Sequence, residues 1–307
     1  MSKSATVEEL LRSGAHFGHL TRRWNPKMKE FIFMQRNGIH IIDLKKTEKY
    51  LEEATEQATA FARMGKTILF VGTKKQSRDI IRTEAMRCGM PYVTHRWLGG
   101  MLTNFSTVKR SIERMQEIDK QRADGTYEEL TKKERLMRDR EYKKLEDTLG
   151  GIANLGRLPG AVFVVDTTKE SIAVNEAVKL NIPIIAMVDT NSDPDIPDHI
   201  IPCNDDSART IQLITSRIAD AILEGVSERA AIKEEQLYEE AALESTTKEI
   251  AAKESRRPGM RTRGRRGQQG RQGGAPARGK DAAPSKEAAK PSAEAAPKAP
   301  SAPEGGE

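Results

Sequence analysis

The sequence has 307 residues, of which 37% are hydrophobic, so part of the chain can bury a core. Its formal net charge of +6 comes from the C-terminal end, because residues 256–307 carry a net charge of +7 and residues 1–255 a net charge of −1. This distribution excludes attraction of a polyanion by the bulk charge of residues 1–255. A polyanionic partner would have to meet local basic patches.

Membrane insertion and disulfide chemistry are not indicated. No apolar run approaches the roughly 18 residues that a membrane-spanning helix needs, and the first residues lack the apolar stretch of a signal peptide. The two cysteines, Cys88 and Cys203, lie far apart without metal-type spacing. We expect a cytoplasmic protein in which both thiols are reduced and buried as small apolar side chains.

Residues 14–29 combine two histidines, four cationic side chains, a tryptophan and an Asn-Pro break. Such a segment pairs hydrogen-bond donors and charges with a flat aromatic ring, which suits the phosphates and bases of a nucleic acid. The alternative is a loop that lies on its own domain with its side chains satisfied there. The candidate RNA contacts in this segment are Arg22, Arg23, Trp24, Lys27 and Lys29.

Short β-branched runs alternate with helical stretches in the next part of the chain. This pattern predicts an α/β fold with a doubly wound, mainly parallel sheet of the Rossmann or flavodoxin-like kind. Two alternating runs within residues 31–43 flank Asn37 and Gly38 and predict a β-hairpin, since both residues tolerate positive φ. Further strands are predicted at residues 67–71, 92–94, 161–165, 184–188 and 200–201.

Three of these strands end in similar tripeptides that begin with Val and end with Thr, at residues 71–73, 165–167 and 188–190. Thr73 with Gln76, and Thr167 with Glu170, have the spacing of a capping box and predict that a helix starts at each. The carboxyl ends of parallel strands meet along one edge of a sheet, where ligands commonly bind.

Residues 105–150 have a different composition, with twelve cations and eleven acids between positions 109 and 147. Apolar residues recur at helical spacing, a break falls near residues 123–126, and Thr131 with Glu134 predicts a second capped helix. We expect an inserted antiparallel coiled-coil hairpin that projects from the α/β body. Lys109 and Arg110 at its start are further candidate RNA contacts.

The last part of the chain loses its apolar periodicity. We expect an acidic helical extension at residues 226–255 and a disordered tail at residues 256–307, first rich in Arg and Gly and then in Ala and Pro. The α/β domain itself is expected to span residues 1–104 and 151–225.

His16 and His19 could ligate a divalent ion if Asp189 and Asp205, which follow late strands, fold back beside them. The candidate ligands are His19, Asp189 and Asp205. A histidine pair without cysteine partners more often forms structural hydrogen bonds, so no cofactor is expected beyond this structural ion.

Residues 72–75 resemble a phosphate-binding turn, but the spacing matches neither nucleotide-binding glycine fingerprint. Lys74, Lys75 and Arg78 remain candidate phosphate contacts, and a solvated first helical turn explains them equally well. In residues 95–105 we expect Trp97 to pack at the root of the hairpin, and Arg96 and Asn104 to lie on the surface as further candidate RNA contacts. The spacing supports no catalytic constellation.

Several of these segments together resemble a known family, the second protein of the bacterial small ribosomal subunit. The resemblance covers residues 5–226, and its motifs lie at residues 15–19, 24–28, 70–75, 96–104 and 159–166. It implies an α/β domain with an inserted coiled-coil hairpin, bound to small-subunit ribosomal RNA between head and body. It also implies that the chain helps to recruit the large messenger-binding protein of that subunit.

The resemblance carries RNA contact over to Arg22, Arg23, Lys27, Lys74, Lys75 and Arg96, and makes the hairpin an arm that reaches RNA or a neighbouring protein. The tail at residues 256–307 exceeds the family's usual length, and for it we expect added non-specific attraction to RNA. We therefore expect a non-catalytic structural constituent of the ribosome, in the cytoplasm. The alternatives are a nucleotide- or sugar-phosphate-binding enzyme and a free regulator of messenger RNA.

Overall fold

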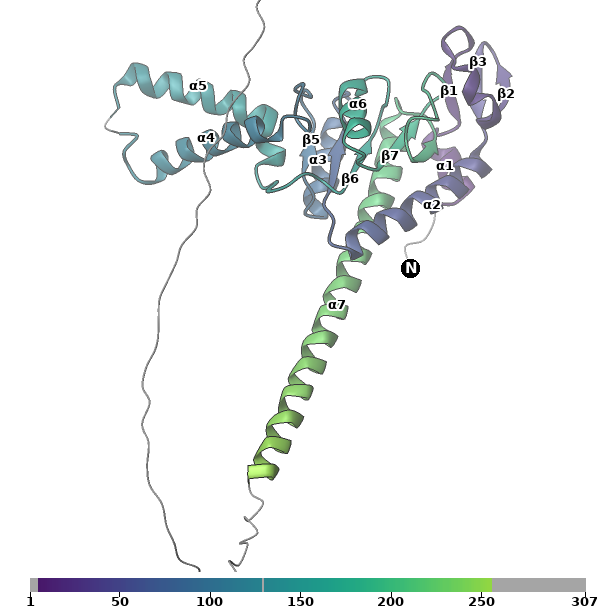
Figure 1. Ribbon diagram of the computed structural model, residues 1–307. Helices are drawn as coiled ribbons and strands as arrows, with labels where there is room; N and C mark the ends of the chain where they lie inside the picture. The colour runs from purple at the N-terminus through teal and green to yellow at the C-terminus, as the bar shows by residue number, and fades with distance from the viewer. Residues whose placement is uncertain (1–4, 129, 256–307) are drawn as a thin grey trace, which may run out of the picture. The chain divides into compact units, whose positions relative to one another are not determined.

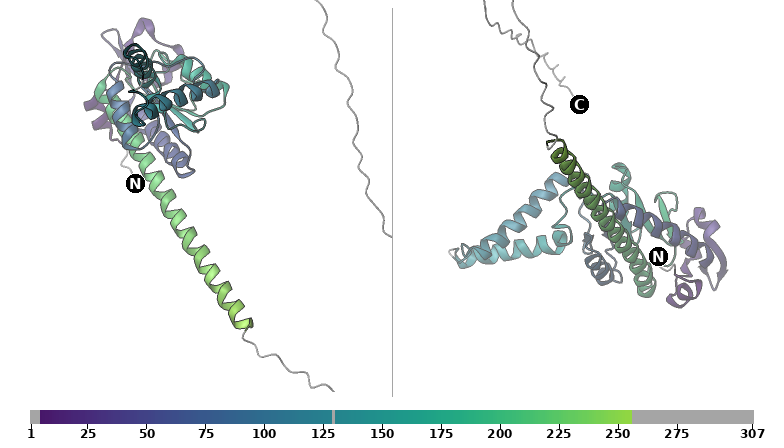
Figure 2. Two further views of the ribbon diagram at one scale, coloured as in Figure 1. Left: turned by 90° about the vertical axis from the view of Figure 1, so that its left-hand side faces the viewer. Right: turned by 90° about the horizontal axis from the view of Figure 1, so that it is seen from below.

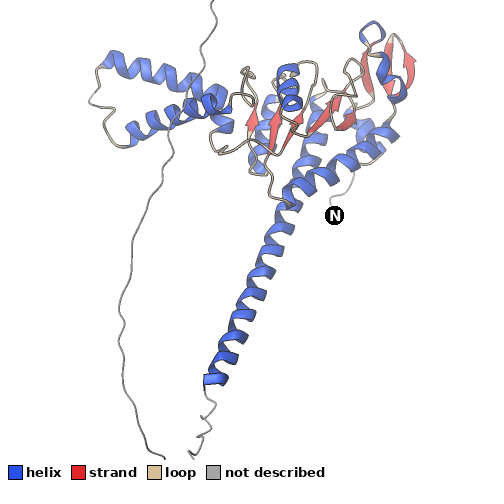
Figure 3. Ribbon diagram, viewed as in Figure 1, coloured by secondary structure: helices blue, strands red, loops and turns tan. Residues whose placement is uncertain are grey.

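Five parallel strands form the main sheet of the computed structural model, which describes residues 5–128 and 130–255. The spatial order is β5-β4-β6-β7-β8, and Figures 1 and 3 show the strands of this sheet with helices around them. Numbered along the chain, the strands of this sheet lie in the order 2-1-3-4-5, the flavodoxin-like arrangement of a doubly wound sheet. The strands are β4 (Ile68–Val71), β5 (Tyr92–Val93), β6 (Ala161–Val164), β7 (Ile184–Val188) and β8 (His199–Pro202).

Helices cover both faces of this sheet. On one face, Phe70, Phe163 and Met187 pack in a buried cluster with residues of α2 (Leu44–Arg63), α3 (Arg78–Arg87) and α7 (Ala208–Ser255). On the other, alternate strand residues such as Val71 and Val162 pack with α6 (Ser171–Lys179), Trp97 and the root of the 105–150 insertion. Burial on both faces explains why the strands appear in the sequence as continuous apolar runs.

A second sheet of three antiparallel strands follows the N-terminal helix α1 (Val7–Ser13), in the order β1-β3-β2. The predicted hairpin is confirmed as β2 (Ile32–Arg36) and β3 (Ile39–Ile42), and Asn37 and Gly38 have φ values of 51° and 74°. Strand β1 (Phe17–Leu20) was not predicted, and it pairs with β3. Short 3-10 turns, η1 (Thr21–Arg23) and η2 (Pro26–Phe31), complete this part of the chain.

The insertion contains two helices in contact, α4 (Phe105–Ala123) and α5 (Lys132–Leu149) (Figure 1). The predicted capping box at Thr131 and Glu134 is confirmed. Ile112, Met115 and Ile118 supply the buried positions of α4. A short turn, η3 (Gly150–Ile152), leads back to β6.

The two capping boxes predicted at the strand ends are wrong. Helix α3 begins at Arg78 and α6 at Ser171, so Thr73 and Thr167 lie too far from the first helical turns to cap them. Glu170 instead accepts hydrogen bonds from the backbone N–H of Thr73 at 2.8 Å and from its hydroxyl at 2.5 Å. A contact between two strand ends has replaced a local cap.

Helix α7 runs without interruption from residue 208 to residue 255 (Figure 2). The helical extension predicted after residue 225 is therefore a continuation of the helix that packs on the sheet. The tail predicted at residues 256–307 lies outside the described residues.

Candidate functional site

Charged side chains meet at the carboxyl ends of β4, β6 and β8, beside the point where the strand order reverses. The ammonium of Lys74, which follows β4, lies 2.8 Å from a carboxylate oxygen of Asp166, 2.7 Å from Asp205 and 2.8 Å from Asp206. The Lys74 side chain is only 11% exposed. We call Lys74 with these three carboxylates the Lys74 cluster.

The electrostatics of the Lys74 cluster follow from its burial. Burial lowers the pKa of Lys74, but the three carboxylates outweigh it and the net pKa is raised, so the ammonium stays charged. Burial, together with the neighbouring carboxylates Asp189 and Asp166, raises the pKa of Asp205 to about 7. The cluster thus holds more carboxylates than its one cation neutralises.

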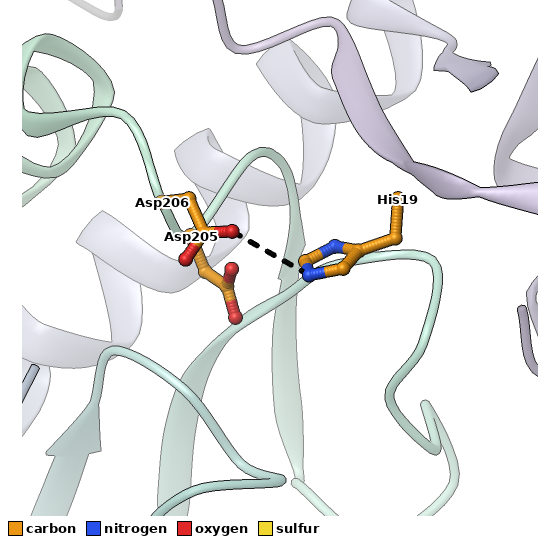
Figure 4. A group of neighbouring side chains, drawn as sticks. All are labelled: His19, Asp205 and Asp206. Carbon is orange, nitrogen blue, oxygen red and sulfur yellow. Dashed lines mark ion pairs between the residues drawn. The ribbon is translucent and has the colours of Figure 1, made fainter. Parts of the chain in front are cut away.

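His19 of β1 approaches the same edge from the N-terminal part of the chain. Its Nδ1 lies 2.9 Å from Asp189, and its Nε2 faces Asp206 at 3.5 Å (Figure 4). The hydrogen bond to Asp189 is the main cause of the raised pKa of His19. The backbone N–H of His19 also donates to the Thr190 hydroxyl at 2.8 Å, which fixes β1 against the end of β7.

The potential ligand atoms of His19, Asp205 and Asp206 all lie within 4.8 Å of one another (Figure 4). This set differs from the predicted one, because Asp189 contacts the opposite ring nitrogen of His19. Oδ1 of Asp205 lies 2.7 Å from the Lys74 ammonium, whereas Oδ2 is buried and has no hydrogen-bond partner among the described residues. His16 lies apart from the group, with its ring on Phe17 at a centroid distance of 4.0 Å. The arrangement matches a ligating histidine held by a carboxylate on its second nitrogen.

The predicted RNA contacts do not converge on one site. Arg22, Arg23 and Lys29 are exposed beside β1, whereas Trp24 is half-buried against His40 and Lys27 pairs with Asp193 and Asp195. Lys74 is enclosed by carboxylates. Arg78 and Arg96 line a common hollow. The remaining candidates are all exposed: Lys75, Arg78, Arg96, Asn104, Lys109 and Arg110.

Sequence comparison decides the family. A family model described as ribosomal protein S2 matches residues 10–225. The chain belongs to the ribosomal protein S2 family. It is therefore a structural ribosomal protein and not an enzyme.

Curated relatives in this S2 family bear the name small ribosomal subunit protein uS2. The chain is 57% identical over 234 residues to the Salinibacter ruber protein, an alignment covering 76% of this chain and 73% of that protein. It is 58% identical over 242 residues to the Chlorobaculum tepidum protein, covering 78% and 96%, and 58% identical over 221 residues to that of Chloroherpeton thalassium, covering 72% and 88%.

One further buried carboxylate shapes this S2-family fold, and the sequence analysis missed it. Glu176 of α6 accepts five hydrogen bonds from residues 97–103, at 2.7 to 3.1 Å, including one from Nε1 of Trp97. The packing role expected of Trp97 is confirmed, since its side chain lies in the core. The available signal was a charged residue on the apolar face of α6, where Ala173, Val174 and Ala177 are buried.

Both cysteines are buried and free, as expected. Among the helices that the structure describes, none is long and apolar enough to cross a membrane.

Proposed function

We propose that the chain assembles into the small ribosomal subunit in the cytoplasm and there binds ribosomal RNA between head and body. The observation that carries this proposal is the identity of 57–58% with relatives named as small-subunit proteins. The exposed cations of residues 1–255 support RNA binding. Because this region has no net positive charge, it must bind the phosphates of RNA through local basic patches.

The proposed RNA contacts are the exposed candidates that form no ion pair with a carboxylate among the described residues, together with the half-buried Trp24. Lys27 and Lys74 are left out, since each already forms ion pairs with acidic side chains. The proposed set is Arg22, Arg23, Trp24, Lys29, Lys75, Arg78, Arg96, Asn104, Lys109 and Arg110.

Reversal of Arg22, Arg23 and Lys29 to Glu tests the contribution of the N-terminal segment. Grouped reversal is needed because single changes on a large wet interface have small effects. We expect the variant to be depleted from the small-subunit band on sucrose-gradient sedimentation, whereas the unmodified chain is stoichiometric there. Reversal of Lys45, Lys179 and Arg209, which are exposed elsewhere, serves as the charge-matched control.

Normal assembly of the first variant would remove the N-terminal segment from the proposed interface. Recovery of the unmodified chain only in a low-mass fraction would contradict the proposal and favour the free messenger-RNA regulator.

The 105–150 insertion is proposed to form a two-helix coiled coil that reaches RNA or a neighbouring protein. The seam of Ile112, Met115 and Ile118 on α4 supports coiled-coil packing. Together with this arm, the chain is proposed to help recruit the large messenger-binding protein of the subunit. Subunits assembled with and without the chain should differ in the amount of that protein that co-sediments, and equal amounts would contradict the recruitment role.

We further propose that Nε2 of His19 and the carboxylates of Asp205 and Asp206 bind a structural divalent ion such as Zn²⁺. Asp189 would hold the ring through Nδ1, and one nitrogen with carboxylate oxygens is a ligand set that zinc accepts. The buried Oδ2 of Asp205, which has no hydrogen-bond partner among the described residues, supports this proposal.

Calorimetric titration of the chelator-washed full chain with Zn²⁺ alone tests the ion site. We expect one ion per chain, and at least tenfold weaker binding in Asp206→Asn, since loss of one ligand removes a charged donor. Asp195→Asn, an exposed carboxylate outside the group, should bind as the unmodified chain does. Failure of the unmodified chain to bind zinc stoichiometrically would contradict the proposal.

A further inference from the structure

A basic hollow of about 500 Å³ opens between the 105–150 insertion and the carboxyl ends of β4 and β5. Five cationic side chains and one carboxylate supply its charges. They are Arg78, Arg96, Arg140, Lys143, Lys144 and Asp147. The net positive charge of this hollow contrasts with the net charge of −1 for residues 1–255 as a whole.

The cations come from three separate segments of the chain. Arg78 is the first residue of α3, and Arg96 lies in the loop after β5. Arg140, Lys143 and Lys144 stand at positions i, i+3 and i+4 of α5, which places them on one face of that helix. Elements that are distant in the sequence thus bring like charges to one place.

Among residues 5–128 and 130–240, no side chain forms an ion pair with any of these five cations. Other cations of the same insertion do so: Arg114 pairs with Glu117 and Glu141, and Arg122 pairs with Asp139. The one carboxylate in the hollow, Asp147, does not balance five cations, so the cations repel one another and an anion bound among them would relieve this repulsion. The guanidinium groups of Arg78, Arg96 and Arg140 can each bind a phosphate through two parallel hydrogen bonds.

A second hollow of about 360 Å³ continues the first and shares His95, Asp147 and Thr148 with it. It adds one cation, Arg82, which lies one turn after Arg78 on α3, and one further carboxylate, Glu146. A single inorganic anion would meet only part of the cations that line the first hollow, whereas consecutive phosphodiesters can contact several of them. The spread of five cations over three segments therefore favours a nucleic-acid strand over a free ion.

We propose that the basic hollow binds consecutive phosphates of an RNA strand and that this RNA bridges α5 and the sheet domain. The inference rests on the proposed binding of ribosomal RNA and assigns it a specific place on the surface. One RNA segment would then contact the insertion and the main sheet at once.

The test is a full-length variant with Arg96→Gln, Arg140→Gln and Lys143→Gln, three exposed changes that keep helix-compatible side chains. Arg78 is left unchanged, because its Nε donates to the carbonyl of Thr73 at 3.2 Å and its loss could disturb the fold. Binding to a small-subunit ribosomal RNA transcript is measured across a salt series, and circular dichroism with thermal unfolding checks that the variant is folded.

We expect the slope of log affinity against log salt to fall in magnitude by about two to three, since each lost phosphate contact removes roughly 0.7–0.9. The control carries Lys45→Gln, Lys179→Gln and Arg209→Gln, which removes the same charge from exposed positions outside the hollow. Its slope should stay within about half a unit of that of the unmodified chain, less than one phosphate contact.

An unchanged slope in the hollow variant would overturn the inference while leaving the proposed function intact. Equal losses in variant and control would also overturn it, because the effect would then be general charge. If the unmodified chain did not bind the transcript, the proposed function would fail first and the inference with it.

Discussion

The carboxylate of Glu176 shows how much one side chain can organise in this protein. It accepts five hydrogen bonds from the loop that joins β5 to α4, and so ties the root of the insertion to α6. Burial raises the pKa of Glu176, but the hydrogen bonds from Thr103, Trp97, Leu102 and Gly100 outweigh it and the net pKa is lowered.

Glu176→Gln should lower the free energy of unfolding by about 2 to 4 kcal/mol at pH 7, because the amide loses the charge and turns a donor towards backbone N–H groups. Urea unfolding of both proteins measures the difference. A loss below about 0.5 kcal/mol, the size of an ordinary surface change, would mean that the five bonds do not stabilise the loop.

The same comparison has a defined pH dependence. Because the folded-state pKa of Glu176 is lowered, its contribution is fully present above the ordinary pKa of 4.5. The contribution is lost as the pH falls from 4.5 through the lower folded-state pKa. Unfolding series from pH 7 to pH 3 should therefore show the two proteins converging in acid. A difference that grew in acid would contradict the assigned direction.

Lys74 is the second residue whose role depends on its surroundings. Lys74→Met should destabilise the chelator-treated protein by about 3 kcal/mol or more, since it leaves two buried carboxylates, Asp166 and Asp205, without their cation. Lys75→Met is the matched control, because Lys75 is exposed and should change the free energy of unfolding by less than about 0.5 kcal/mol. Similar values for the two variants in urea unfolding would contradict this account.

Sequence reasoning could not separate these two neighbouring lysines. Both stand after β4 in a turn that resembles a phosphate-binding loop, and only the positions of Asp166, Asp205 and Asp206 distinguish them. Those carboxylates lie 92 to 132 residues away along the chain. The site residues that sequence reasoning placed correctly, such as Trp97 in the core, needed only local composition.

At the scale of elements, α2 and α7 approach closely at Gly225. A Cβ there would lie 2.4 Å from the carbonyl oxygen of Thr59 and 2.8 Å from the Cβ of Ala62. The Thr59 hydroxyl also donates to the carbonyl of Ala221 at 3.1 Å, which joins the two helices at the same level.

Gly225→Ala should therefore destabilise the protein by about 1 to 3 kcal/mol in thermal or urea unfolding, although alanine is normally the better helix former by roughly 0.5–1 kcal/mol. Gly156→Ala is the control, because a Cβ at Gly156 would meet no atom within 4 Å. Stabilisation of the Gly225 variant would show that the helices can move apart without cost.

Elements with a strong local signal were predictable. The continuous apolar runs of β4, β6 and β7 require burial on both faces, and Asn37 and Gly38 require a tight turn, so local physics decides these cases. Strand β1 was missed because its four residues include a glycine and a histidine and show no apolar run, and only pairing with β3 makes them a strand. The starts of α3 and α6 were misplaced because Glu170 bonds across the sheet edge to Thr73.

At the scale of the whole molecule, the S2-family region ends at residue 225, and the basic residues after 255 lie beyond it. Changing Arg261, Arg263, Arg265 and Arg266 to Gln in the full chain should reduce the salt dependence of RNA binding, since each phosphate contact adds close to one unit to the slope. Affinity at low salt should fall equally for ribosomal and unrelated RNA. An unchanged slope would mean that these arginines do not attract RNA.

The contacts between the first and last parts of the S2-family region bear on how the protein is made. The carbonyl of Ala15 accepts from the N–H of Asn204, and the carbonyl of Ser13 accepts from the hydroxyls of Ser207 and Thr210 at 2.9 and 3.0 Å. A chain is synthesised from its N-terminus, so residues 13–19 lack these hydrogen-bond partners until about two hundred residues have been synthesised. The native fold can therefore be completed only late in translation. Premature termination before β8 would yield a polypeptide whose N-terminal segment lacks its hydrogen-bond partners.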